Sequence, residues 1–131
     1  MSSVRNDPVV SVVGLDHIVL ACNDVERTLA WYRDVLGLAE VRVEQWRRGE
    51  VPFPSVRVDD RTIIDLLAGE PTDGRLDHFC LLVERVDLDA LAASGAVEVV
   101  EGPATRFGAQ GDGTSLYVRD PDGLVVELRH Y

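Results

Sequence analysis

The sequence predicts an α+β fold built from two tandem β-α-β-β-β units. The tripeptide Leu-Asp-His occurs twice, at 15–17 and at 76–78. Each copy is followed, at almost the same distance, by an acidic residue inside an apolar run: Asp65 in the first half and Glu127 in the second. In both halves, short apolar runs rich in β-branched residues surround one segment with helical spacing. A duplicated structural unit explains all three observations.

The first unit spans about residues 13–68. Its opening run, 15–22, has the composition of a strand, and Asn23 or Asp24 then offers an N-cap for a helix. Apolar residues near helical spacing, with Gly37 in the position of a C-cap, predict that this helix covers about 24–36. Further strands are expected at about 39–46, 53–59 and 62–67.

The second unit, about 75–131, repeats this order in shorter form. Its predicted elements are a strand at 76–83, a helix at 87–94 and strands at 96–100, 114–119 and 124–130. Segment 102–113 contains four glycines and a proline, so we expect a long loop that serves as a lid or rim. Because only the short crossing 69–75 joins the units, we expect one domain over 13–131, preceded by an N-terminal tail, 1–12.

Composition narrows the classes of protein to consider. With 46% hydrophobic and 27% charged residues, the 131-residue chain has the make-up of a globular domain. A net charge of −10 argues against binding to nucleic acid. No apolar run approaches the ~20 residues of a membrane span, and no secretory signal is visible. Cys22 and Cys80 do not form a disulfide framework, so we expect free thiols and a cytoplasmic location.

Strand periodicity places the repeated histidines and acids among apolar neighbours. Alternate residues of a strand share a face, so His17 lies with Val19, and Asp65 with Leu67. The same reasoning applies to His78 and Glu127. An ionisable group in such surroundings is costly unless it is paired or coordinated. Two imidazoles with one or two carboxylates are a recognised ligand set for a divalent metal ion, so the repeat predicts a metal site.

Two longer motifs carry a family resemblance. They are Leu15–Leu20 with the helix end Trp31–Leu38, and Arg119–Gly123 followed by Val126–Leu128. In this order and spacing the chain resembles the vicinal oxygen chelate superfamily, which comprises glyoxalases, bleomycin-resistance proteins and ring-cleaving dioxygenases. A finer match over 101–117 is similar to members called glyoxalase domain-containing protein 5, whose chemistry is not settled.

The resemblance implies a half-open curved sheet, made by two βαβββ modules, around one divalent metal ion per site. Carried over residue by residue, it implies the metal ligands His17, His78 and Glu127, with Asp65 in the place of a fourth ligand. Asp65 is one methylene shorter than the glutamate of glyoxalase-type members, so it is either a ligand or a partner of one. Zinc, nickel, manganese, cobalt and iron remain open.

Three functions follow as hypotheses. The first is a metal-dependent glyoxalase-like lyase or isomerase acting on a small substrate that chelates the ion through neighbouring oxygens, with Asp65 or Glu127 as the base. The second is a metal-free protein that sequesters a drug or metabolite, as bleomycin-resistance members do. The third is an Fe(II) ring-cleaving dioxygenase. Trp46, Phe53 and Arg106 are the candidate substrate contacts.

Assembly is the last expectation. In the resembling family, a homodimer often completes the site by bringing the first unit of one chain to the second unit of another. We therefore expect a homodimer in which each site takes His17 from one chain and His78 with Glu127 from the other.

Overall fold

The computed structural model describes residues 8–70, 74–119, 121 and 123–131. The first unit consists of β1 (Val12–Cys22), α1 (Val25–Asp34), β2 (Ala39–Val41), α2 (Val43–Arg47), β3 (Ser55–Asp59) and β4 (Thr62–Ala68). The second consists of β5 (Leu76–Val83), α3 (Leu88–Ala93), β6 (Glu98–Gly108), β7 (Gly111–Arg119) and β8 (Val125–His130). The α+β fold with two β-α-β-β-β units is therefore confirmed.

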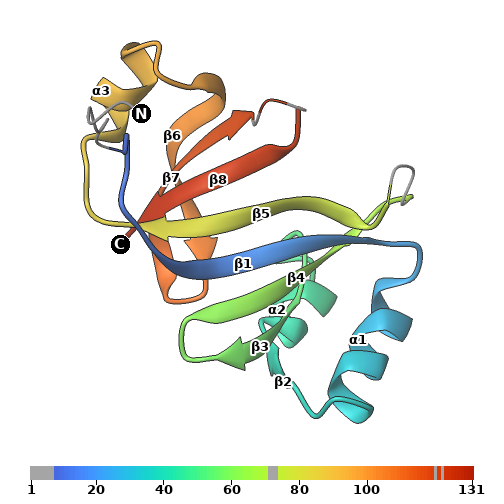
Figure 1. Ribbon diagram of the computed structural model, residues 1–131. Helices are drawn as coiled ribbons and strands as arrows, with labels where there is room; N and C mark the ends of the chain where they lie inside the picture. The colour runs from blue at the N-terminus through green and yellow to red at the C-terminus, as the bar shows by residue number, and fades with distance from the viewer. Residues whose placement is uncertain (1–7, 71–73, 120, 122) are drawn as a thin grey trace, which may run out of the picture.

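All eight strands form one mixed sheet, in the order β2-β3-β4-β1-β5-β8-β7-β6. Within each unit the first and last strands pair in parallel, β1 with β4 and β5 with β8. The antiparallel pairing of β1 with β5 joins the two units at the centre of the sheet. Figure 1 shows the resulting open, twisted sheet, with α1 and α2 beside the first unit and α3 beside the second.

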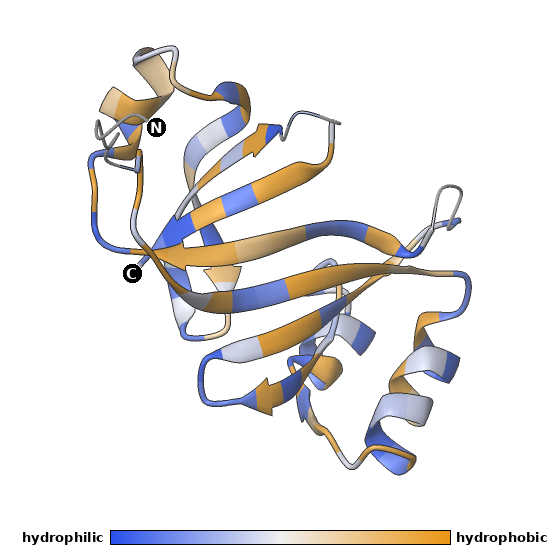
Figure 2. Cartoon of the chain, viewed as in Figure 1, coloured by the Kyte–Doolittle hydropathy of each residue, from blue (hydrophilic) through white to orange (hydrophobic). Residues whose placement is uncertain are grey.

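Each unit has its own hydrophobic core, where its helices pack on one face of its strands. The first core contains Cys22, Val25, Leu29, Val43, Val56 and Leu66, and the second contains Val83, Leu88, Leu91, Leu116, Val118 and Leu128. Leu66 and Leu128 are sequence neighbours of Asp65 and Glu127. Because adjacent strand residues point to opposite faces, the cores occupy one face and the acids the other. Figure 2 shows hydrophilic positions interrupting the apolar central strands.

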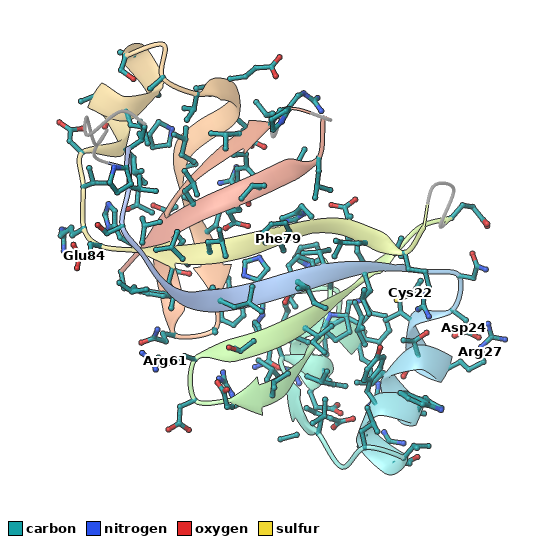
Figure 3. All side chains as sticks on the ribbon, viewed as in Figure 1. Cys22, Asp24, Arg27, Arg61, Phe79 and Glu84 are labelled. Atoms are coloured by element: carbon teal, nitrogen blue, oxygen red, sulfur yellow. The ribbon has the colours of Figure 1, made fainter. Side chains whose placement is uncertain are left out.

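Local signals account for the starts of α1 and α3. Asp24 is the N-cap of α1, and its side chain accepts a hydrogen bond from the Arg27 backbone N–H at 3.0 Å. Figure 3 shows both residues at the beginning of this helix. Asp87 caps α3 in the same way through the Ala90 N–H. Among the described residues, no helix is long and apolar enough to cross a membrane.

Two elements differ from the expectation. The predicted strand 39–46 stops at Val41, and α2 follows, because Val43 and Trp46 lie on one face of a helical turn and pack on the first core. The predicted loop 102–113 is instead the β6–β7 hairpin, which turns at Ala109 and Gln110. Its glycines allow close packing: a Cβ on Gly108 would lie 2.6 Å from Asp16 Oδ1 and from Tyr131 Oη.

The chain joins the sheet slightly earlier than the predicted tail boundary. The Glu84 N–H donates to the Ser11 carbonyl, and Val10 packs against the second core. Most of the predicted tail, 1–7, lies outside the described residues, as do parts of the crossing 69–75 and of the turn 119–123.

Candidate metal centre

The four predicted ligands come from the four central strands. Asp65, His17, His78 and Glu127 lie on β4, β1, β5 and β8, which are neighbours in the sheet. Glu127 Oε1 is 3.1 Å from His17 Nε2 and 3.1 Å from His78 Nε2. Ligand atoms of these three residues all lie within 4.8 Å of one another. The two halves of the repeat thus converge on one point.

An aspartate orients each imidazole, and this explains the repeated Asp-His pair. His17 Nδ1 donates to Asp16 Oδ1 at 2.8 Å, and His78 Nδ1 donates to Asp77 Oδ2 at 2.7 Å. Both aspartates sit at irregularities in the β1–β5 pairing, where the strand holds one residue more than its partner. Such bulges re-aim side chains. With Nδ1 engaged in this way, Nε2 of each ring is directed toward Glu127, as in carboxylate–histidine–metal arrangements.

Glu127 is held in its charged form. Burial raises its pKa, but hydrogen bonds with His17 and His78 and the hydroxyl of Ser115 outweigh burial and lower the pKa far below the usual value. Ser115 Oγ donates to Oε2 at 2.7 Å, and Arg129 Nη2 donates to the same oxygen at 3.3 Å. Oε1 therefore remains directed at the imidazoles.

Asp65 stands slightly apart from the other three groups. Its Oδ2 is 3.7 Å from His17 Nε2, and its Oδ1 accepts a hydrogen bond from Ser55 Oγ. Burial raises the pKa of Asp65, and the charge of Glu127 adds to this effect, although His17 and Ser55 oppose it. The two carboxylates of the site therefore differ: Glu127 is firmly ionised, and Asp65 is biased toward accepting a proton.

The side chain of Asp16 ties this centre to the β6–β7 hairpin and the C-terminus. Asp16 is fully buried and accepts hydrogen bonds from the Ala109 N–H at 3.0 Å and from the Tyr131 hydroxyl. Tyr131 Oη in turn accepts from the Gln110 N–H at 3.0 Å. Buried Arg129 lies against the same group, with its Nε 3.9 Å from Asp16 Oδ1. This network fixes the position of His17 from behind.

A cavity of about 390 Å³ opens in front of the four groups. Besides them, it is lined by Val19, Arg42, Pro52, Phe53, Leu67, Thr105, Arg106, Phe107 and Tyr117. Val19 and Leu67 share this face as strand periodicity predicts. The volume suits a small molecule.

The candidate substrate residues divide into two groups. Phe53 and Arg106 line the cavity, whereas Trp46 belongs to α2 and packs against the first core. The assignment of Trp46 rested on a strand that is a helix in the structure. Sequence reasoning missed Arg42, Phe107 and Tyr117 as cavity residues. It also missed the role of Asp16 and Asp77, although both belong to the repeated tripeptide.

A single chain brings the predicted ligand set together. His17, His78 and Glu127 meet within one chain, because β1 and β5 of the same chain pair side by side. The sharing of sites between two chains stays a prediction. The homodimer itself stays a prediction.

The residues fit a divalent cation. Burial lowers the pKa of each imidazole, but hydrogen bonding outweighs it and raises both: His17 through Asp16 and Glu127, and His78 through Glu127 and Asp77. The surroundings therefore favour positive charge at the point where the two Nε2 atoms and Oε1 converge. Nitrogen and carboxylate oxygen donors at one point are the ligand chemistry of first-row transition ions.

Comparison with known proteins identifies relatives of the chain. The chain is 31% identical over 122 residues to virulence protein STM3117 of Salmonella typhimurium, covering 89% of this chain and 83% of that protein. It is 35% identical over 133 residues to glyoxalase domain-containing protein RDO1 of Mycosarcoma maydis, covering 97% and 73%. The fold matches that of the Mn(II)-bound glyoxalase from Novosphingobium aromaticivorans with a TM-score of 0.65 at 21% identity, over 92% of this chain and 40% of that one.

A family model matches residues 14–128, which include all four predicted ligands. The chain therefore belongs to the Glyoxalase/Bleomycin resistance protein/Dioxygenase superfamily.

Proposed function

We propose that the protein is a divalent-metal-dependent enzyme of the glyoxalase type, with lyase or isomerase chemistry on a small substrate that presents two neighbouring oxygens. One observation carries the proposal: His17 Nε2, His78 Nε2 and Glu127 Oε1 converge within 4.8 Å beside a cavity of about 390 Å³. Those three residues would hold the ion, and Asp65 lies within reach as a fourth group. When bound, the ion supplies a Lewis acid that polarises a carbonyl oxygen.

Asp65 is the better candidate for moving the proton next to that carbonyl. A general base works best when its pKa approaches the working pH, and burial raises the pKa of Asp65. The Ser55 hydrogen bond occupies Oδ1 and leaves Oδ2 on the side of His17. Glu127, by contrast, has a lowered pKa and both of its oxygens are engaged. The structure thus supports Asp65 as base and Glu127 as ligand.

The cavity walls would keep the reacting end dry. Val19, Leu67 and Phe53 supply apolar lining, and the Tyr117 ring lies edge-on to His78 with 5.6 Å between centroids. Exclusion of water strengthens the electrostatic interactions of a site and protects reactive intermediates. The reacting end of a small substrate would therefore lie between apolar walls, next to the metal-binding groups.

A second candidate is Fe(II)-dependent dioxygenase chemistry. Its support is that the tightly converging set contains two histidines and one carboxylate, with Asp65 outside it. That composition suits ferrous iron with open positions. Metal-free sequestration is the third candidate, supported by the aromatic lining from Phe53, Phe107 and Tyr117.

The deciding experiment compares the wild type with Asp65→Asn and the control Asp60→Asn, which makes the same change at an exposed turn. Protein purified without an affinity tag is analysed for metal and then tested for exchange of the α-proton of a hydroxyketone in D2O. We expect metal in all three proteins and exchange that falls by about 10²-fold or more only in Asp65→Asn. Oxygen consumption with catechols would favour the dioxygenase, and persistent absence of metal would favour sequestration.

A further inference from the structure

Arg42 is the residue of the cavity that the proposed chemistry leaves unused. It has φ 58°, the one positive φ of a non-glycine residue within the described part of the chain. A bulky side chain in this left-handed region is disfavoured, and such strain persists only where surrounding structure enforces it. The contacts of the Arg42 side chain are therefore expected to hold this backbone conformation in place.

Two aromatic rings hold the guanidinium group of Arg42. Its Cζ lies 3.7 Å from the centroid of the Phe107 ring and 5.4 Å from that of Phe53. Both rings line the same cavity. When a guanidinium stacks on an aromatic ring, the ring contacts the flat face of the guanidinium. The N–H groups along the edge of the guanidinium then remain available to a ligand.

One of those N–H groups has no partner. Arg42 Nε is buried and finds no hydrogen-bond acceptor among the described residues. Burial lowers the pKa of Arg42, and Asp65 and Asp112 only partly offset this through longer-range attraction. An unsatisfied buried donor is costly. A ligand acceptor in the cavity that draws the edge of the guanidinium toward itself would remove that cost.

Arg106, the other arginine of the cavity, is already occupied. Its Nη2 pairs with Glu101 Oε1, and its Nη1 donates to the Thr105 carbonyl at 2.9 Å. The sequence pointed to Arg106 as a candidate substrate contact. The contacts instead leave Arg42 as the cavity arginine with an unpaired donor.

We propose that Arg42 recognises a carboxylate on the substrate, at the end away from the oxygens that reach the metal centre. This inference rests on the proposed function and adds a substrate class to it: small acids with two neighbouring oxygens at the other end. A carboxylate fits better than a phosphate because the negative charges of Asp65 and Asp112 also act at Arg42. A dianion would be repelled more strongly by them, whereas a monoanion is matched by one arginine.

The test uses hydroxamates, which chelate a metal through two neighbouring oxygens. The monohydroxamates of succinate, glutarate and adipate are compared with analogues of the same lengths that end in a neutral amide. Binding to the Zn²⁺-loaded protein is measured by calorimetry. We expect the best-fitting carboxylate to bind about tenfold more tightly than its amide, because hydrogen bonds to charged groups are the strong ones.

The variants assign the preference to Arg42. Arg42→Gln should abolish it, and so should Arg42→Asn, which tolerates the left-handed backbone if glutamine does not fold there. Arg48→Gln removes the same charge from an exposed arginine and should keep the preference. A carboxylate preference that survives in both Arg42 variants, or equal binding of acid and amide by the wild type, would overturn the inference.

Failure of the proposed metal-dependent function would give a different result in the same experiment. If no hydroxamate binds, neutral or charged, the chelating function is wrong. Titration of glutarate into metal-free protein then decides the role of Arg42: the Nε–H resonance that disappears in Arg42→Gln should shift in the wild type. An unshifted resonance at saturating glutarate counts against the carboxylate site.

Discussion

At the scale of single residues, the aspartate in the middle of each Leu-Asp-His repeat orients the proposed metal-binding histidine. Each aspartate lies at a bulge beside the histidine that follows it and hydrogen-bonds its Nδ1 atom. The histidines and acids could be identified from the sequence, because a strand pattern exposes ionisable residues that share an apolar face. The bulges could not, since they arise from the pairing of β1 with β5, which are far apart in the chain.

We predict that Asp16→Asn weakens metal binding about 10- to 100-fold, the usual range for outer-sphere partners of ligands. The Asp16 carboxylate is fully buried and accepts several hydrogen bonds, one of which comes from His17. Water cannot easily take the place of this carboxylate. Asp77→Asn should have a smaller effect, because Asp77 is exposed and water can take its place. Competition with a chromophoric chelator measures both affinities. Equal losses in the two variants would contradict this account.

The pH dependence also follows from these residues. The pKa values of His17 and His78 are raised in the folded protein. Their contribution to the stability of the metal-free protein is therefore fully present below the unfolded value of about 6.5, and it is lost as pH rises through the folded values. A metal ion must displace those protons, so the stabilisation that it provides should grow over the same pH window.

Melting curves with and without Zn²⁺ between pH 6 and 9, a range that brackets the unfolded imidazole pKa of about 6.5, test this second prediction. The gain in Tm on adding metal should increase with pH, and proton release on binding should be detectable by calorimetry in buffers of different ionisation enthalpy. Glu127→Gln should remove most of the gain at every pH, because Glu127 is itself a proposed ligand, and it should also lower both imidazole pKa values. A metal-induced gain that is larger at pH 6 than at pH 8 would refute the linkage.

At the scale of elements, the sequence predicted the strands that carry the ligands better than the elements that close the cavity. Short apolar runs rich in β-branched residues identify β1, β4, β5 and β8, because much of both faces of these central strands is buried. In the 102–113 segment, glycine and proline suggested a loop, yet these residues belong to a hairpin. Gly108 and Gly113 lie where β6 and β7 approach the side chains of Arg129 and Tyr131, a tertiary contact that composition does not reveal.

We predict that Gly108→Ala lowers the free energy of unfolding by about 1–3 kcal/mol, the usual cost of overpacking. The new methyl group would lie 2.6–2.7 Å from atoms of Asp16, Tyr131 and Arg129. Urea denaturation of the metal-free protein measures the change. Gly69→Ala is the matched control, because its Cβ would meet nothing within 4 Å, and it should stay within about 0.5 kcal/mol of the wild type. A neutral Gly108→Ala would show that the hairpin relaxes away from the network.

At the scale of the whole molecule, one chain can bring the full ligand set together. The family pattern had suggested sites divided between two chains, and chain connectivity alone does not decide between the alternatives. Within one chain, the β1–β5 pairing brings the ligands together, and the two strands are far apart in the sequence. A homodimer stays a prediction, and sedimentation at micromolar concentration checks it.

Mixing two defective chains distinguishes the alternatives. We expect His17→Ala and Glu127→Ala chains to remain metal-deficient after mixing, because each chain lacks a ligand of its own site. Elemental mass spectrometry gives the metal content, and native mass spectrometry shows whether subunits have exchanged. Recovery of metal in part of the mixed population would instead demonstrate a site shared between chains.

The seam between β1 and β5 gives the metal a mechanical role as well. Two of the four groups, His17 and Asp65, come from the first unit, and His78 and Glu127 come from the second. Neither half alone offers more than one imidazole and one carboxylate to an ion. A bound cation would therefore cross-link the two units at the middle of the sheet. The two hydrophobic cores share no residue, and the cation would make them unfold and fold together.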